Sequence, residues 1–346
     1  MWNVALLGDV CQISSSKRIF AKEYQKKGIP FYRGKEIIEK HKGNDVTTEL
    51  FISPDRYKEI KNKYEVPRKG DVLLTSVGTL GVTWLVDEDE FYFKDGNITW
   101  LRPNEKIIPE FLYLWLNSTE AQNQIDAKCI GSTQKALTIE TLNKFYISLP
   151  SIDLQYKIIA IIKPLEDKIV NNRKINKNLE QQAQAIYSCM FIEHRQESWS
   201  TGQLSDLISV KYGKDHKKLA DGNYPVYGSG GIMRYVEKPL YTGESVLIPR
   251  KGTLNNVMYV SEAFWSVDTM FYTEMLHPNI AKFVYHFVKS KDLASLNAGS
   301  AVPSMTTNIL NAMQLYIPDE KTLEKFENIV SPMYSACLLY TSDAAD

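Results

Sequence analysis

Two segments of the sequence carry side chains suited to binding a polyanion. Residues 17–42 hold nine Lys and Arg against three Glu, a net charge of +6. Residues 211–218 are also basic, and an Arg-Lys pair precedes a Gly-Thr dipeptide further on. Lys and Arg neutralise phosphates, while Arg, Gln, Ser and Thr reach base edges. We therefore predict DNA contacts at these positions: Lys17, Arg18, Arg33, Lys35, Thr79, Ser132, Gln134, Lys214, Lys217, Ser229, Arg250, Lys251 and Thr253.

Each of these features also has an ordinary explanation. A run of charges usually forms a solvated surface, so the parallel placement of the two basic segments is what favours binding. Arg33, Gln134, Ser229 and Arg250 are the predicted base readers within the set. The glycine-rich run 228–231 could cradle a phosphate through backbone N–H groups. A turn that needs positive φ angles is the more common reason for such a run.

Motifs for catalysis are missing from the sequence. It contains no G-x-x-x-x-G-K-[ST] loop, no H-E-x-x-H and no Asn/Asp-Pro-Pro-aromatic tetrapeptide. The five histidines are scattered, and the four cysteines form no C-x-x-C pair. We therefore expect reduced thiols in a cytoplasmic protein, with no zinc site, no cofactor and no catalytic residues. The net charge is zero, so a surface for nucleic acid must be local.

A long helix over residues 151–193 is the element that would position these segments. Apolar or amide residues recur there at spacings of three or four, which predicts heptad-like packing against a partner helix. At ~1.5 Å per residue the segment would extend roughly 60 Å. Pro164 lies inside it, so we expect a kink or a second helix starting there. The predicted seam contains Leu154, Ile158, Ile161, Leu165, Ile169, Asn172, Asn176, Leu179 and Ile186.

Short β-like runs fill the sequence on both sides of this helix. Before it, strands are predicted at 72–74, 82–86, 91–93 and 98–101, and a helix at 109–117. After it, strands are predicted at 246–248, 257–260 and 270–274, and a helix at 280–288. No apolar run approaches the ~20 residues of a membrane span, and the start does not resemble a signal peptide.

The two sides share a repeated pattern. Gly131-Ser132, Leu137-Thr138, Leu142 and Pro150 recur as Gly299-Ser300, Met305-Thr306, Leu310 and Pro318 with the same spacings. Segments 29–32 and 224–227 are similar, and each side has a Gly-Thr-Leu tripeptide after a predicted strand. The sequence therefore predicts a duplicated module, each copy a globular domain followed by a helix.

The second helix of this duplication is short. Only residues 323–333 follow the pattern of the first helix, which predicts an open apolar seam along residues 179–190. We set residues 337–346 aside as a non-native tail, the alternative being a genuine frayed end. The expected domains are 1–150 and 197–318 for two recognition domains, 151–196 for the central helix and 319–336 for the start of the second helix.

These motifs, in this order, resemble the specificity (S) subunits of type I restriction–modification systems. The resemblance covers about residues 1–336 and includes the openings at Trp2 and Trp199 and the segment 165–191 of the central helix. It implies an α+β fold with two mixed α/β target-recognition domains, separated by long helices that form an antiparallel coiled coil with pseudo-twofold symmetry. Each domain would bind one half of a split site in double-stranded DNA.

The resemblance also implies partners. The helices would bind adenine-methylating modification subunits and, through the assembly, restriction subunits with translocase and endonuclease activity. The chain itself would have no catalytic role and no contact with membrane. Two other classes stay open: an enzyme with an unrecognised site, such as a nuclease, and a coiled-coil scaffold without a role in DNA binding. A subunit of a system that only methylates has the same sequence features.

Overall fold

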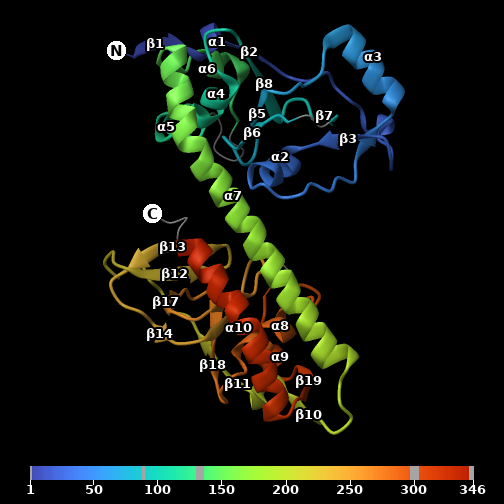
Figure 1. Ribbon diagram of the computed structural model, residues 1–346, viewed down its shortest axis with the longest axis vertical. Coiled ribbons are helices and arrows are strands. Elements are labelled where there is room, and N and C mark those ends of the chain that lie inside the picture. The colour runs from blue at the N-terminus through green and yellow to red at the C-terminus, as the bar shows by residue number, and fades with distance from the viewer. Residues whose placement is uncertain (1, 88–89, 130–135, 297–303, 343–346) are drawn as a thin grey trace. The chain divides into compact units, whose positions relative to one another are not determined.

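A computed structural model describes the backbone of residues 2–87, 90–129, 136–296 and 304–342, and side chains within these ranges as far as residue 337. The chain divides into two compact units, Met1–Lys174 and Ile175–Asp346. Each unit is described by itself (Figure 1).

The first unit is a mixed α/β fold. Its strands are β1 (Asn3–Leu6), β2 (Cys11–Ser14), β3 (Ile29–Tyr32), β4 (Phe51–Ile52), β5 (Val72–Thr75), β6 (Thr83–Leu85), β7 (Tyr92–Phe93), β8 (Ile98–Pro103) and β9 (Tyr146–Leu149). Its helices are α1 (Leu7–Val10), η1 (Ala21–Glu23), α2 (Gly34–His41), α3 (Pro54–Tyr64), α4 (Pro109–Leu116), α5 (Thr119–Lys128) and α6 (Ile139–Asn143), followed by α7 (Ile152–Ser188), which continues into the second unit. The strands form sheets of order β2-β8-β5-β6, β4-β3-β7 and β1-β9.

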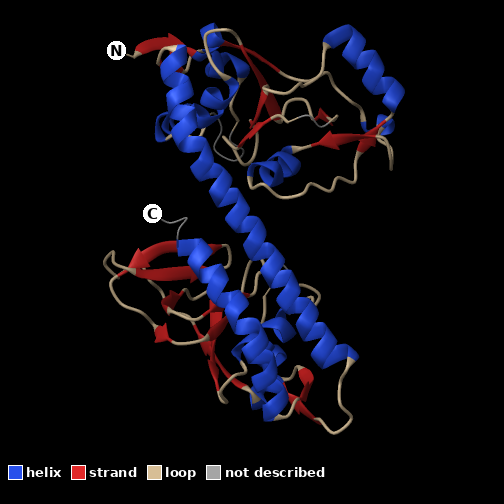
Figure 2. Ribbon diagram, viewed as in Figure 1, coloured by secondary structure: helices blue, strands red, loops and turns tan. Residues whose placement is uncertain are grey.

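The second unit repeats this plan. Its strands are β10 (Ser200–Gln203), β11 (Ile208–Tyr212), β12 (Tyr224–Gly228), β13 (Gly231–Val236), β14 (Tyr241–Thr242), β15 (Ser245–Pro249), β16 (Met258–Val260), β17 (Ala263–Ser266), β18 (Met270–Met275) and β19 (Gln314–Ile317). Its helices are η2 (Cys189–Glu193, a π-helical turn), η3 (Leu204–Asp206), α8 (Ala281–Lys289), α9 (Thr307–Asn311) and α10 (Glu320–Ser342). The sheets have the orders β11-β18-β15-β16, β13-β12-β17-β14 and β10-β19, and Figure 2 shows the strands of each unit beside its helices.

The structure explains why the end of each repeat is similar in sequence. Thr138 and Thr306 are the N-caps of α6 and α9, and each side chain accepts a hydrogen bond from a backbone N–H in the first turn. Leu142 and Leu310 are fully buried within those helices. The strand that follows each helix pairs antiparallel with the first strand of the same unit. The duplication and the strands and helices predicted from the sequence are confirmed.

The cores lie between helix and sheet in each unit. In the first unit, Phe111, Leu112 and Trp115 of α4 pack on residues of β5 and β8. Pro109 begins α4, where a missing N–H costs nothing and the fixed φ suits the first turn. In the second unit, α8 is buried almost throughout its length. Its Phe283 lies 4.8 Å, ring centre to ring centre, from Phe191 at the end of the long helix.

Of the two outcomes expected at Pro164, a kink or a second helix, the second helix is wrong. Helix α7 runs unbroken from Ile152 to Ser188 with Pro164 inside it, so no second helix starts at the proline. Helix α10 extends to Ser342, which puts residues 337–342 inside the helix that was expected to end at 336. Pro332 is likewise accommodated within α10.

The predicted open seam is also misplaced. Within the second unit α7 and α10 are antiparallel, since Phe191 contacts Phe326 while Asn176 donates to the carbonyl oxygen of Cys337, 3.5 Å away. One face of residues 179–190 is therefore covered, with Ala183 and Tyr187 buried. Because the two helices are antiparallel, the beginning of α10 packs against the end of α7. A short second helix therefore covers the last turns of α7.

Candidate nucleic-acid interface

In the second unit, one edge of the sheets gathers the loops that carry the predicted DNA contacts. The end of β15 pairs with the start of β18 at Pro249 and Met270, and the end of β11 pairs with the same start at Tyr212 and Phe271. β12 and β17 are parallel and pair near their ends, at Tyr227 and Ser266. The loops that leave β11, β12, β15 and β17 therefore emerge together.

Direct contacts join these loops. The guanidinium carbon of Arg250 lies 5.3 Å from the ring centre of Tyr212. Arg250 also donates to the carbonyl oxygen of Asp268 at 3.4 Å. The side chain of Asn256 donates to the carbonyl oxygen of Ser229 at 2.7 Å. The glycine-rich turn and the Arg-Lys-Gly-Thr loop, far apart in sequence, thus form one surface.

The first unit has the corresponding edge. Thr75 at the end of β5 pairs with Ile98 at the start of β8, and Ser14 at the end of β2 pairs with Trp100. The hydroxyl of Ser16 donates to the carbonyl oxygen of Phe93 at 2.8 Å, which ties the loop after β2 to the end of β7. The basic segment that follows Ser16 therefore leaves from the same edge as the Gly-Thr turn after β5.

The two Gly-Thr turns occupy equivalent positions. Gly78 has φ +81° and Gly252 has φ +86°, a region that residues with a Cβ rarely adopt. The loop before each glycine is held in the same way: Leu137 N–H donates to the carbonyl oxygen of Ser76, and Met305 N–H donates to that of Arg250, both at 2.9 Å. Thr79 and Thr253 follow these glycines, and both are exposed.

Ion pairs engage part of the basic segment in the first unit. The Nε of Arg18 lies 2.8 Å from a carboxylate oxygen of Asp95. Arg33 and Lys35 both approach the buried carboxylate of Glu36, at 3.1 and 3.5 Å. Glu36 is already counted in the net charge of +6, so Asp95 is what makes this surface less positive than residues 17–42 alone indicate. The side chains of Arg18 and Lys35 stay 67% and 57% exposed, so a phosphate can compete for these two cations.

Lys17 is placed differently. Its backbone N–H donates to the hydroxyl oxygen of Tyr92 at 2.7 Å, and its ammonium lies 4.7 Å from the ring centre of Tyr64. Burial raises the pKa of Tyr92 to about 12, so the hydroxyl stays protonated. The Lys17 side chain is exposed.

Lys214 lies at the edge of the second unit, and Lys217 lies in the turn beyond it. The N–H of Lys214 donates to the carbonyl oxygen of Ser266, and its own carbonyl accepts from the indole of Trp265, both at 2.8 Å. The N–H of Lys217 donates to a carboxylate oxygen of Asp215 at 3.0 Å. Both lysines are exposed. Ser132 and Gln134 lie outside the described residues.

The predicted seam residues of α7 divide into four groups. Ile158 packs on the core of the first unit and Ile186 on that of the second. Asn172 is buried. Ile161 and Leu165 are 68% and 59% exposed, so here the heptad pattern marks an uncovered surface. The residues of intermediate exposure are Leu154, Ile169, Asn176 and Leu179.

A buried polar network in the second unit was not foreseen. The ammonium of Lys282 on α8 lies 2.8 Å from Glu244 and 2.6 Å from Glu327 of α10. Burial lowers the pKa of Lys282, but its bonds to the two carboxylates outweigh this effect and raise it overall. Tyr285 donates to Glu180 of α7, which also pairs with Lys289. Nothing in the sequence spacing reveals these partners, because they come from three helices and a strand end.

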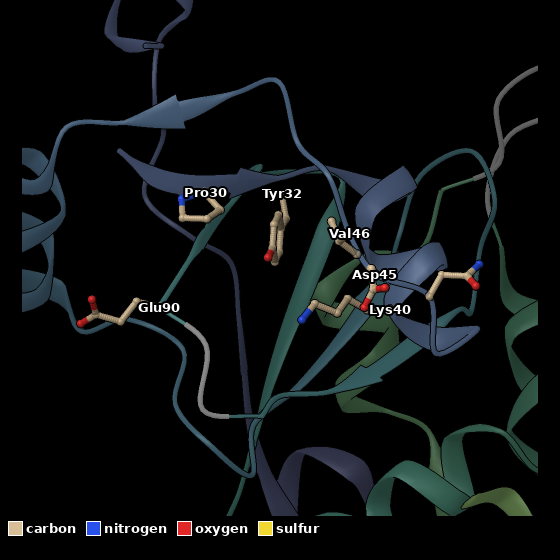
Figure 3. Close-up of a pocket in the computed structure, with 7 residues that line it drawn as sticks. Pro30, Tyr32, Lys40, Asp45, Val46 and Glu90 are labelled. Atoms are coloured by element: carbon tan, nitrogen blue, oxygen red, sulfur yellow. The ribbon is translucent and has the colours of Figure 1, made fainter. Parts of the chain in front are cut away.

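A pocket of about 420 Å³ opens beside β3 and α2 in the first unit (Figure 3). The lining residues are Pro30, Tyr32, Lys40, Asn44, Asp45, Val46 and Glu90. The ammonium of Lys40 lies 3.6 Å from Asp87 and 4.9 Å from the ring centre of Trp84. An ammonium held between a carboxylate and a ring suits ion pairing, and we assign no reaction to the pocket.

Comparison with known proteins identifies the family. The model of the type I restriction modification DNA specificity domain matches residues 1–181 and again residues 196–335. The chain belongs to this family. The two matches coincide with the two copies of the repeat, so each unit contributes one specificity domain with its helix.

Known relatives agree with this assignment. The chain is 32% identical to the type I restriction enzyme HindI specificity subunit of Haemophilus influenzae over 44% of this chain and 36% of that protein. It is 30% identical to the EcoBI specificity subunit of Escherichia coli over 51% of this chain and 38% of that protein. Each alignment thus spans less than half of the relative's length.

The fold also matches a solved structure. The S subunit of a type I restriction–modification system from M. genitalium aligns with a TM-score of 0.60 at 16% identity, over 100% of this chain and 92% of that one. This similarity confirms the α+β fold with two repeated domains and long helices. Among the helices in the described part of the chain, none is long and apolar enough to cross a membrane.

Proposed function

We propose that this chain is the DNA-specificity subunit of a type I restriction–modification complex, with each unit binding one half of a split double-stranded site. Modification subunits that methylate adenine and restriction subunits that translocate and cut DNA would supply the catalysis. The chain itself would need no cofactor and would act in the cytoplasm. The domain boundaries 1–150 and 197–318 are part of this proposal.

The observation that carries the proposal is the equivalent loop edge of the two units. In both, a left-handed Gly-Thr turn emerges beside basic and hydroxyl side chains, fixed by the same backbone hydrogen bond. Phosphate contacts orient a protein on DNA, and side chains that reach base edges determine the sequence bound. Two equivalent loop edges, one in each unit, suit binding to the two halves of a split site.

Salt dependence of DNA binding tests the phosphate contacts. The chain assembled with its modification subunits should bind target DNA with an affinity that falls steeply with salt. Replacing both Lys17 and Arg18 by Ala should flatten the slope of log K against log salt by ~0.9 per lost phosphate contact. Lys106 is a matched control, because it follows the opposite end of β8 and is exposed. Lys106→Ala should leave the slope unchanged.

Methylome sequencing tests the base contacts. Arg250→Ala should relax one position in one half-site by ~1–3 kcal/mol and leave the other half-site intact. Lys238, exposed beyond the opposite end of β13 from the glycine-rich turn, serves as the control. Equal loss of methylation at all sites would contradict a base-reading role for Arg250.

Two other outcomes would favour the alternative functions. Metal-dependent cleavage of DNA by the isolated chain would favour a nuclease, and salt-independent or absent DNA binding by the assembly would favour a scaffold.

A further inference from the structure

The end of the long helix gathers three side chains of metal-binding type. Cys189, Glu193 and His194 each offer a ligand atom, and these atoms all lie within 4.8 Å of one another. All three residues are exposed. We propose that they form a Zn²⁺ site, with a fourth position open to water or to a side chain from another molecule.

The backbone of η2 creates this arrangement. In an α-helix, residues four apart share a face and residues five apart do not. Cys189 begins a π-helical turn, and the N–H of His194 donates to the carbonyl oxygen of Cys189 at 3.0 Å. This bond spans five residues, so His194 joins Cys189 and Glu193 on one side of the helix. Such single π turns are frequent at functional sites.

The distance between the thiol and the ring suits a tetrahedral ion. Bonds of ~2.3 Å to sulfur and ~2.05 Å to nitrogen at a tetrahedral angle place the two atoms about 3.6 Å apart. Cys189 Sγ and His194 Nδ1 lie 3.5 Å apart. The carboxylate of Glu193 completes the set by rotation of an exposed side chain.

The donor set selects the metal. A thiolate, an imidazole and a carboxylate suit Zn²⁺, whereas Mg²⁺ and Ca²⁺ prefer oxygen ligands. The two negative charges of the thiolate and carboxylate balance the ion. His194 Nδ1 also lies 3.0 Å from the carbonyl oxygen of Cys189. Since a carbonyl oxygen only accepts, this contact is a hydrogen bond donated by Nδ1–H. Binding an ion through Nδ1 breaks it and moves the ring proton to Nε2, and the thiol proton is released to solvent.

The surroundings hold the turn in place. Phe191, in the middle of η2, is buried against Trp199 and Phe326. It anchors the backbone while the three ligand side chains face outward. The neighbouring cation Arg195 is stacked 3.9 Å from the ring centre of Tyr316. A bound ion would fasten the last turn of the long helix where the chain enters the second repeat.

The sequence expectation of no zinc site rested on the absence of paired cysteines. The spacing of Cys189, Glu193 and His194 brings the three side chains together only in a π turn.

Titration of the intact, reduced chain with Co²⁺ tests the site. One Co²⁺ per chain should bind with a thiolate charge-transfer absorption in the near ultraviolet, and Zn²⁺ should abolish it by displacement. Cys189→Ser should lose this absorption. Removing a residue that only hydrogen-bonds to a metal ligand weakens metal binding at least about tenfold, and removing a ligand itself should weaken it at least as much. His194→Gln should therefore bind Co²⁺ at least about tenfold more weakly. Zn²⁺ should also raise the Tm of the unmodified chain, reversibly with a chelator, but not that of Cys189→Ser.

Matched controls keep the test specific. Cys129→Ser and His277→Gln replace a second partly accessible thiol and a second exposed histidine, and both should bind Co²⁺ like the unmodified chain. Circular dichroism of each variant verifies folding. Absence of the charge-transfer absorption at saturating Co²⁺ would overturn the proposal and leave a thiol–imidazole hydrogen bond only. So would an absorption that persists in Cys189→Ser or disappears in Cys129→Ser.

Discussion

Acidification should weaken the second unit through one buried histidine. His286 on α8 is fully buried. Its Nδ1 donates to Gln184 of α7 at 2.7 Å, and its Nε2 accepts from the hydroxyl of Tyr334 on α10 at 2.9 Å. Burial lowers the pKa of His286 from 6.5 to about 4, with Glu180 opposing this shift and Lys289 adding to it. The folded chain therefore keeps the ring neutral where the unfolded chain protonates it.

The direction and size of this pH effect follow from the difference in the pKa of His286 between the folded and the unfolded chain. Between about pH 6.5 and pH 4 the unfolded state binds more protons at this position, so the free energy of unfolding falls as the pH falls. A pKa difference of 2.5 units lowers the free energy of unfolding by about 3 kcal/mol once the pH is low enough to protonate the ring in both the folded and the unfolded chain. About 2 kcal/mol of this should be lost by pH 5. Above pH 7 the contribution should be constant.

Hydrogen exchange of α8 peptides between pH 7 and pH 5, corrected for intrinsic rates, reports the opening free energy of this unit. His286→Gln keeps a polar group of similar size but takes up no proton. We expect this variant to be less stable at pH 7 by ~1–3 kcal/mol, since a buried partner loses its hydrogen bond, and to show a flatter pH dependence. The exposed residue His277 provides the control, and His277→Gln should keep the full dependence. Equal pH slopes for His286→Gln and the unmodified chain would refute the reasoning.

Three further outcomes are expected. Gly78→Ala and Gly252→Ala, at φ +81° and +86°, should each destabilise their unit by about 1–2 kcal/mol in urea unfolding and weaken DNA binding, whereas an unchanged midpoint would mean that these turns tolerate a Cβ. Phe191→Ala should cost ~3–5 kcal/mol, and a loss below 1 kcal/mol would show that the core around it collapses to fill the space. Four residues inserted between Lys174 and Ile175 add about 6 Å and rotate the following residues by about 40°. Methylome sequencing should then find the same half-site bases with a gap longer by roughly one to two base pairs, and an unchanged gap would make the helix a tether.

Much of the fold was predictable from the sequence because its local signals agree. Alternating apolar runs gave the strands around β5, β8, β15 and β18, and a proline start gave α4. The repeat was recognisable because Thr138 and Thr306 cap a turn and Leu142 and Leu310 fill a core, which are constraints imposed by neighbours along the chain. The family resemblance followed from the order of these motifs.

Tertiary structure decided the rest, because burial and pairing depend on residues distant in sequence. Apolar spacing marked Ile161 and Ile186 as equally suitable for a core, yet Ile186 packs on the core of the second unit and Ile161 is exposed. The charge available on the basic segment also depends on a distant residue, because Asp95 pairs with Arg18 across 77 positions of sequence. Residues 189–194 form a cluster of ligands because the backbone makes a π turn, and no side-chain pattern in the sequence specifies that extra residue in the helix.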